Sequence, residues 1–479
     1  MTHNHPTRNR WVAFGVLCLG VLMIVLDTTI VNVALPSIRT DLGFTETSLV
    51  WVVNAYMLTF GGFLLLGGRL GDLYGHRKLF LAGIAIFSIA SLACGLARSQ
   101  EMLVGARAVQ GLGGAVVSAV ALSLVMNLFT EPAERAKAMG VYGFVCAGGG
   151  SIGVLLGGLL TSQLSWHWIF LVNLPIGAAV AALAMRLIAP GEASAGKRLD
   201  AAGAIAVTSS LVLAVYAVVN GNDAGWHSAQ TLGLLGVSVV LMGAFIAIEW
   251  KVAAPLMPLH VFRSRNLSAA NAIGVLWAAA MFAWFFISAL YMQLVLGYTP
   301  MQVGLAFLPA NVIMAVFSLG LSARCVVRFG LRVPLVAGLL LAACGLALFA
   351  RAPVQGVFLV DVLPGMLLLG LGAGIAFNPV LLAAMSDVDP RDSGLASGIV
   401  NTSFMMGGAL GLAVLASVAA ARAQAMAGQL ALDAPALNSG YHAAFAAGAL
   451  FAVMAALGGM LLGPASRRSE PAASGLDAS

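Results

Sequence analysis

A single acidic residue, Asp27, lies deep in an apolar segment of this 479-residue chain. The segment runs to Pro36, about nine residues further on, so a helix would place the carboxyl group roughly 13 Å from that end. An ionised carboxylate in hydrocarbon costs several kcal/mol unless it is hydrated or paired, and such residues usually have a function. Asp27 is therefore a candidate for binding and releasing a proton. The structural alternative is a helix-end carboxylate that reaches the lipid headgroups.

Arg107 lies at a comparable depth, about five residues inside the same end of another apolar segment. Arginine stays protonated in proteins, so it can serve as a fixed positive partner that favours the charged form of a nearby acid. Asp27 and Arg107 together predict proton-dependent chemistry within the apolar region. An arginine whose side chain extends to the headgroups is the alternative.

The composition shows what kind of chain must position these groups. Apolar residues make up 61% of the chain and charged residues only 9%, and the mean hydropathy is +0.98. A soluble chain of this length would need more charge. The net charge of +6 comes from basic residues scattered singly between apolar runs, so we expect no nucleic-acid partner. The chain contains no phosphate loop and no HExxH motif, and we expect neither an enzyme nor a bound cofactor or metal.

Apolar segments long enough to cross about 30 Å of hydrocarbon as helices recur along the whole chain. The sequence therefore predicts an all-α integral membrane protein with fourteen transmembrane helices. The approximate spans are 12–34, 48–67, 79–97, 102–128, 138–164, 168–188, 201–220, 229–249, 267–296, 303–323, 333–350, 357–384, 395–420 and 442–463.

The positions of Lys and Arg predict the orientation of these spans. An even number of spans puts both termini on one side, and most of the 24 basic residues then lie in the segments on that side. Because basic loops stay in the cytoplasm, both termini are predicted to be cytoplasmic in a multi-pass protein of the cell membrane.

The order of the spans suggests two six-helix bundles with two inserted helices between them. We expect an N-terminal bundle in 1–188, a linker with the inserted helices in 189–266, and a C-terminal bundle with a cytoplasmic tail in 267–479. A short basic loop ending in Gly-x-Arg follows the second span of each bundle, in 68–78 and 324–332. Such an internal repeat is typical of duplicated transporters.

The first of these loops resembles the signature of the major facilitator superfamily, and it reads Gly68-x-Leu70-Gly71-Asp72-x-x-Gly75-His76-Arg77-Lys78. The resemblance implies that the acidic residue pairs across the two halves and stabilises the outward-open state. We therefore expect a conformational latch made of Gly68, Asp72, Gly75, Arg77 and Lys78. The alternative is a solvated turn that only sets the topology.

Two further motifs resemble proton-coupled members of this superfamily. The end of the first span resembles the signature of the fourteen-helix drug:proton antiporter branch, and it reads Leu26-Asp27-Thr28-Thr29-Ile30-Val31-Asn32-Val33-Ala34-Leu35-Pro36. The fourth span resembles the proton-coupling motif of the superfamily, and it reads Leu103-x-x-x-Arg107-x-x-Gln110-Gly111-x-Gly113-Gly114-Ala115. These resemblances imply that Asp27 and Arg107 couple protons to transport.

The fifth span resembles the glycine-rich antiporter motif through Gly149, Gly153, Gly157 and Gly158, whose small face lets two helices approach closely. The family pattern has proline where this chain has Val154, which removes a point of bending. Glycines of the later half, in 364–374 and 394–409, also resemble the fourteen-helix branch. Close helix packing alone is the alternative for these glycines.

The substrate cavity is expected between the bundles. Span 267–296 is rich in aromatic residues and methionines, which can adapt to varied flat or cationic molecules, although half of them should face lipid. The predicted cavity residues are Asn32, Gln110, Trp284, Tyr291 and Asn401.

These features and resemblances predict a secondary transporter with a major-facilitator-like fold. Its expected function is proton-driven efflux of a lipophilic or cationic drug or antibiotic, which would confer resistance. The proton gradient is its energy source, and its partners are the substrate, protons and the lipid bilayer. A monomer is compatible with this reading. The alternative is proton-coupled or facilitated transport of another metabolite, in either direction.

Overall fold

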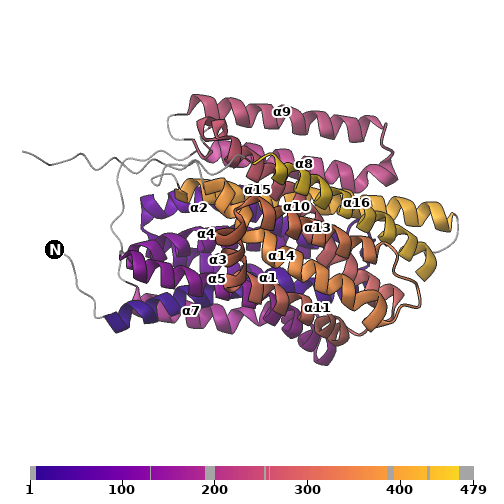
Figure 1. Ribbon diagram of the computed structural model, residues 1–479, viewed down its shortest axis with the longest axis horizontal. Coiled ribbons are helices and arrows are strands. Elements are labelled where there is room, and N and C mark those ends of the chain that lie inside the picture. The colour runs from indigo at the N-terminus through magenta and orange to yellow at the C-terminus, as the bar shows by residue number, and fades with distance from the viewer. Residues whose placement is uncertain are drawn as a thin grey trace, which may run out of the picture.

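The computed structural model describes residues 7–129, 131–188, 200–252, 255–257, 259–385, 393–428 and 432–462. The predicted linker before the inserted helices and the predicted C-terminal tail lie outside these ranges for the most part. Regular structure in the described residues is helical (Figure 1). The helices are α1 (Thr7–Leu42), α2 (Val50–Tyr74), α3 (His76–Gly95), α4 (Gln100–Leu128), α5 (Pro132–Gln163), α6 (Trp168–Leu171), α7 (Asn173–Leu187), α8 (Ala201–Ala224), α9 (Ala229–Lys251), η1 (Leu259–Arg263), α10 (Arg265–Leu290), η2 (Tyr291–Val295), α11 (Pro300–Val316), η3 (Phe317–Leu321), α12 (Ser322–Phe329), α13 (Arg332–Phe349), η4 (Phe358–Val362), α14 (Leu363–Met385), α15 (Ser393–Ala427) and α16 (Ala434–Met460).

Local sequence signals set where several of these helices begin and turn. Ser99 accepts a hydrogen bond from the backbone at the start of α4, and Thr299 forms a capping box with Gln302 at the start of α11. Gly75 and Gly330 lie in the two basic loops that resemble each other, and they have φ angles of 88° and 75°. Glycine adopts such angles without strain, so each loop uses a glycine with positive φ to end the preceding helix.

Twelve helices of the described residues are long and apolar enough to cross a membrane. The expected spans 138–164 and 303–323 lie on α5 and on the run from α11 to α12, which are not among the twelve. The first helix also differs from expectation, because Pro36 lies inside α1 and the helix continues to Leu42. Ile38, beyond the proline, is fully buried, so packing holds the helix together where one backbone hydrogen bond is lost.

The helices pack as two groups. The first helix group, α1–α7, is held together by contacts such as those of α4 with α2 and α3 and of α1 with α5. The second helix group, α10–α16, is held by contacts of α10 with α15 and of α13 with α14 and α16. Contacts of α5 with α11 and of α2 with α15 join the groups.

The helices α8 and α9 lie at one edge of the molecule (Figure 1). α8 packs against α2 and α15, one from each group, and α9 packs on the far side of α8. Reciprocal hydrogen bonds join the two helices, because the Ser210 hydroxyl donates to the Ser238 carbonyl at 2.7 Å and the Ser238 hydroxyl donates to the Ser210 carbonyl at 2.8 Å.

The aromatic helix α10 is central, and the expectation that half of its large residues face lipid is wrong. Trp277, Trp284 and Phe286 are almost fully buried. The physical reason is that α14, α15 and α16 surround α10. In a membrane protein, apolar residues suit lipid and protein interior equally, so their pattern does not identify the buried face.

Close helix contacts depend on particular glycines. A Cβ atom on Gly113 of α4 would lie 2.7 Å from the Phe87 nitrogen and 3.0 Å from the Gly83 oxygen of α3. Both atoms belong to the backbone, so a side chain at Gly113 would push the two helices apart. Gly105, on the same helix, has open space where its Cβ would lie.

These two glycines give a matched test of the packing. We expect Gly113→Ala to lower the free energy of unfolding by about 1–3 kcal/mol, because it overpacks the contact between α3 and α4. Gly105→Ala should instead raise it by up to about 1 kcal/mol, because alanine is the better helix former. Thermal unfolding of the purified variants in detergent measures the difference, and equal stability of the two would contradict this contact.

Candidate functional site

Asp27 and Arg107 form a buried ion pair. A guanidinium nitrogen of Arg107, Nη1, lies 2.5 Å from Oδ2 of Asp27, and the side chains are 1% and 0% exposed. α1 supplies the acid and α4 supplies the base. The Nε of Arg107 also donates to the backbone carbonyl of Val52 on α2 at 2.9 Å, and its guanidinium lies 4.4 Å from the centre of the Tyr56 ring. These contacts fix the position of the positive charge.

The second carboxylate oxygen of Asp27 accepts two amide donors. Gln110 Nε2 donates to Oδ1 at 2.7 Å, and Asn173 Nδ2 donates to the same atom at 3.1 Å. Both amides also lie within hydrogen-bond distance of the Ser91 hydroxyl. We call Asp27, Arg107, Gln110, Asn173 and Ser91 the Asp27 cluster. It draws on α1, α3, α4 and α7.

Sequence reasoning missed two members of this cluster. Asn173 begins α7 and Ser91 lies within α3, and both are almost fully buried. A polar residue inside an apolar segment is the signal that could have pointed to them. Gln110 was predicted to line the cavity, whereas its amide bonds to Asp27 and accepts from Arg107 at 2.7 Å.

The glycines of α5 face two different helices. Cβ atoms on Gly149, Gly153 and Gly157 would meet residues of α1, including the Thr29 hydroxyl and the Ile30 carbonyl. Gly158 instead faces α11, where its Cβ would lie 2.7 Å from the Pro300 carbonyl oxygen. α5 thus connects α1, which carries Asp27, to the second helix group.

The basic loop after α2 contacts its own helix group. Arg77 donates a hydrogen bond to the Met185 carbonyl at the end of α7, and Gly75 makes the turn between α2 and α3. Gly68 has little around it, since its Cβ would meet only Ala119. Lys78 lies in the first turn of α3. The side chain of Asp72 lies outside the described residues, so its role in a latch stays a prediction.

The structure does not gather the remaining predicted cavity residues into one pocket. The Asn32 amide donates to the carbonyls of Thr28 and Thr29 on its own helix. The Tyr291 hydroxyl donates to the Pro353 carbonyl at 2.8 Å. Trp284 packs between aromatic rings of the second group, and Asn401 is exposed on α15. Their contact with a substrate stays a prediction.

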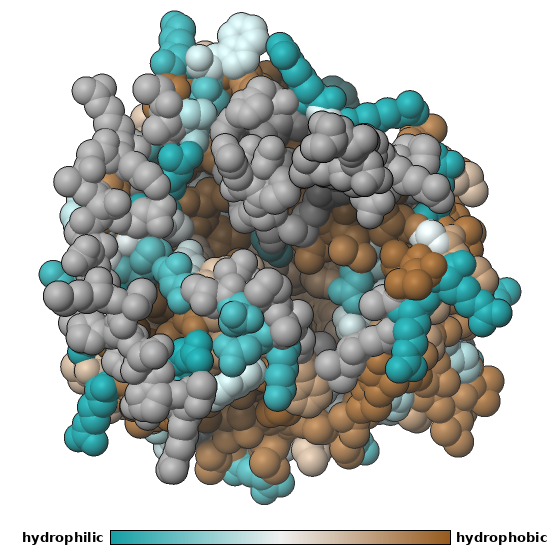
Figure 2. Space-filling view, turned by 60° about the vertical axis from the view of Figure 1, so that its left-hand side comes forward, coloured by the Kyte–Doolittle hydropathy of each residue, from teal (hydrophilic) through white to brown (hydrophobic). Residues whose placement is uncertain are grey.

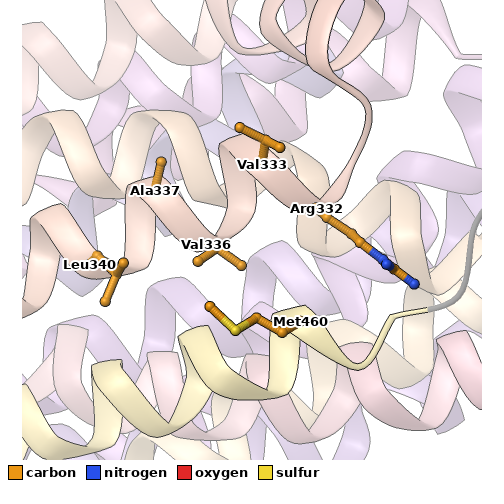
Figure 3. A pocket seen from close by; sticks show the side chains of 6 residues that line it. All are labelled: Arg332, Val333, Val336, Ala337, Leu340 and Met460. Carbon is orange, nitrogen blue, oxygen red and sulfur yellow. The ribbon is translucent and has the colours of Figure 1, made fainter.

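A shallow apolar groove lies on the outside of the second helix group, between α13 and α16. Figure 3 shows Arg332 at one end of it and Val336 of α13 opposite Met460 of α16. Its lining contains none of the predicted cavity residues, and it consists of Arg332, Val333, Val336, Ala337, Leu340 and Met460.

Hydrogen bonds join the two helix groups near the end that holds loop 43–49, which is predicted to face outside. Gln293 donates to the Val33 carbonyl and Asn54 donates to the Ala409 carbonyl, each at 2.9 Å. The Met301 amide donates to the Ser162 hydroxyl at 3.1 Å. Seen from the end where α1 begins, the molecule has a central hollow whose visible walls are largely apolar (Figure 2). The arrangement is closed at the predicted outer end.

Glu46 is a further contact between the groups, and sequence reasoning missed it. Its Oε1 lies 2.9 Å from Arg39 and accepts a long hydrogen bond of 3.5 Å from the Tyr441 hydroxyl on α16. Burial raises the pKa of the Glu46 carboxyl above its usual 4.5, while Arg39 and the Tyr441 hydroxyl oppose this shift without cancelling it.

Comparison with known proteins shows close relatives over most of the chain. The model of the Major Facilitator Superfamily matches residues 17–412. The chain is 38% identical to the puromycin resistance protein pur8 of Streptomyces alboniger, over 86% of this chain and 82% of that one. It is 37% identical to the cephamycin export protein CmcT of Amycolatopsis lactamdurans, over 86% and 85%. It is also 37% identical to the multidrug resistance protein Stp of Mycobacterium tuberculosis, over 84% and 74%.

Solved structures share the fold at low sequence identity. A bacterial homologue of the human lysosomal transporter Spinster has a TM-score of 0.65 at 16% identity, and the match covers 96% of this chain and 98% of that one. The xylose transporter XylE from E. coli also has a TM-score of 0.65 at 16% identity, covering 97% and 100%.

Glu46 predicts a pH dependence of the closed outer end. Its pKa is raised in the closed arrangement, so the closed state gains stability from the proton at low pH and loses it as the pH rises through that raised pKa. Acidifying the outside from about pH 7 to about pH 5 should therefore raise the closed population.

Distances between spin labels at Thr45 and Leu432 report the opening of the outer end. Glu46→Gln should weaken the response, whereas Glu101→Gln, an exposed control at the same end, should keep it. An unchanged response in Glu46→Gln would refute this role.

Proposed function

This chain belongs to the major facilitator superfamily, and on that premise we propose that it exports a lipophilic or cationic drug or antibiotic in exchange for protons. Three relatives support the direction and the substrate class, because their names describe puromycin resistance, cephamycin export and multidrug resistance. The chain covers about three quarters or more of each of these relatives. We place it in the fourteen-helix drug:proton antiporter branch of the superfamily.

The Asp27 cluster is the observation that carries the proton-coupling part of the proposal. Asp27 is charge-balanced by Arg107 and receives two amide hydrogen bonds, so the ionised form is stable although it is buried. A proton on Asp27 removes the charge from this pair and leaves the guanidinium with the Val52 and Gln110 oxygens. The two protonation states therefore favour different arrangements of α1 and α4.

The proposed cycle connects this change to alternating access. Asp27 releases its proton to the cytoplasm, and the drug enters the hollow between the two helix groups. The contacts at the outer end then separate, the drug leaves, and protonation of Asp27 from outside favours return to the closed arrangement. α1 takes part in both events, because it carries Asp27 and its Val33 carbonyl accepts the cross-group bond from Gln293.

The fourteen-helix architecture and the orientation belong to the same proposal. α5 and the run from α11 to α12 would supply the two spans beyond the twelve that are long and apolar enough. The first and second helix groups would be the two bundles, with α8 and α9 as the inserted pair, and both termini would be cytoplasmic.

Cysteine labelling on the inserted pair tests the orientation. His227 lies in the loop between α8 and α9, and Lys251 ends α9, and both are exposed. In a background without the native cysteines, we expect His227→Cys to react with an impermeant reagent on intact cells. Lys251→Cys should react only after the membrane is opened. Labelling of both from outside would exclude this topology.

Removal of the titratable group at Asp27 tests the coupling. We expect Asp27→Asn to reduce drug accumulation to background in everted vesicles with an imposed pH gradient, because asparagine cannot exchange a proton. Asp41→Asn is the matched control, since this acid also lies on α1 but bonds to Trp166 away from the cluster, and it should keep its transport. Undiminished uphill transport by Asp27→Asn would exclude Asp27 from the mechanism.

Folding must be separated from coupling in this test. Asp27→Asn leaves a buried guanidinium without its acid, and breaking such a pair costs about 3–5 kcal/mol. The double variant Asp27→Asn/Arg107→Gln removes both charges and should recover stability without recovering uphill transport. Expression level and thermal unfolding of each variant provide the comparison.

A further inference from the structure

Two buried carboxyl groups meet in the inserted helix pair, away from the Asp27 cluster. Asp200 caps the start of α8, and Glu249 lies in the last turn of α9. Their side chains belong to residues that are only 3% and 4% exposed. Both acids lie at the ends of apolar segments, where a carboxylate would ordinarily be hydrated, so their burial needs a cause.

Each carboxyl group uses one oxygen in an ordinary hydrogen bond. Asp200 Oδ1 accepts from the Gly203 amide at 2.7 Å, and Glu249 Oε2 accepts from the Met257 amide at 2.9 Å. The other two oxygens, Asp200 Oδ2 and Glu249 Oε1, have no donor among the described residues. Both border the same point, because a Cβ on Gly203 would lie 2.5 Å from the first and 2.9 Å from the second.

The surrounding charges do not satisfy these oxygens. The Arg69 guanidinium, from α2, donates to the Pro255 carbonyl at 2.6 Å, and Lys251 on α9 is exposed. No ion pair to either acid is found within the described part of the chain. Two ionised carboxylates in such contact would repel each other, and each would leave a buried acceptor without a partner.

One proton between the two groups removes both problems. The proton neutralises one of the two carboxylates and turns one of its oxygens from an acceptor into a donor. Asp200 Oδ2 and Glu249 Oε1 can then form a hydrogen bond to each other. We propose that Asp200 and Glu249 share a proton and form a second proton-binding site, outside the Asp27 cluster and in the inserted helices. The absence of a side chain at Gly203 leaves room for this contact.

The shared proton also joins three parts of the molecule. Glu249 holds the Met257 amide, and Arg69 holds the Pro255 carbonyl two residues earlier. Leu256 between them packs with Leu66 of α2 and Ala204 of α8. Segment 255–257 therefore connects the acid pair to the end of α2, where the basic loop begins. Loss of the proton would separate the two acids and loosen this connection.

Infrared spectroscopy of the purified full-length protein tests the site directly. We expect the band of a protonated carboxyl group at neutral pH, and we expect Glu249→Gln and Asp200→Asn each to remove it. Each amide can donate to the remaining acid and so replaces the shared proton, and asparagine keeps the cap on Gly203. Either variant therefore suffices if the other does not fold. A band that remains unchanged in each of the two single variants would overturn the proposal.

Thermal unfolding gives a second readout that does not depend on transport. Between about pH 6 and about pH 9, the Tm of the wild type should fall by roughly 2 °C or more beyond the fall seen in Glu249→Gln. The reason is that only the wild type loses the shared proton. Glu101→Gln, an exposed control, should follow the wild type. Equal slopes for wild type and Glu249→Gln would overturn the proposal. So would a rise in Tm with added Na⁺, K⁺, Mg²⁺ or Ca²⁺ in the wild type alone, since a cation would then occupy the site.

Discussion

A charge buried in a membrane protein must be neutralised where it lies, and the first helix group is organised around that requirement. Arg107 is positioned by a carbonyl of α2 and by the ring of Tyr56, and Asp27 is positioned by amides from α4 and α7. Breaking such a pair costs about 3–5 kcal/mol. The four helices of the Asp27 cluster, α1, α3, α4 and α7, and the neighbouring α2 therefore have to meet at one point with little freedom. This explains why the acid, the base and the amides of the cluster are all buried.

Close backbone contact extends this rigidity toward the second helix group. α1 lies against the glycines of α5, and α5 in turn lies against α11 at Gly158. Val154, where the family pattern has proline, is fully buried within the continuous helix α5. A helix without a point of bending moves as a unit, so α5 transmits a displacement of α1 to the interface between the two helix groups.

The sequence allowed the helical fold and the Asp27–Arg107 pair to be predicted, because a charge within an apolar run is visible without any structure. The partners Asn173 and Ser91 were missed, since small polar residues are common in membrane helices. Glu249 and Asp200 resemble ordinary helix-end residues, and only the structure shows that they are buried together. Half of the large side chains of α10 were expected to face lipid, and this was wrong because the hydrophobicity of a membrane helix carries no information about which face meets lipid. The helical continuation past Pro36 depends on tertiary packing that no local signal records.

Apart from the contact of the Glu46 carboxyl with Tyr441, the described hydrogen bonds that close the outer end are made by neutral groups. An amide of Gln293 or Asn54 that leaves its carbonyl partner can bond to water instead, and such an exchange costs only about 0.5–1.5 kcal/mol per bond. Breaking these hydrogen bonds therefore takes no more free energy than the binding of one small molecule can supply. A weakly bound molecule can therefore compensate for the loss of these bonds, so the bonds themselves do not require tight recognition of one substrate.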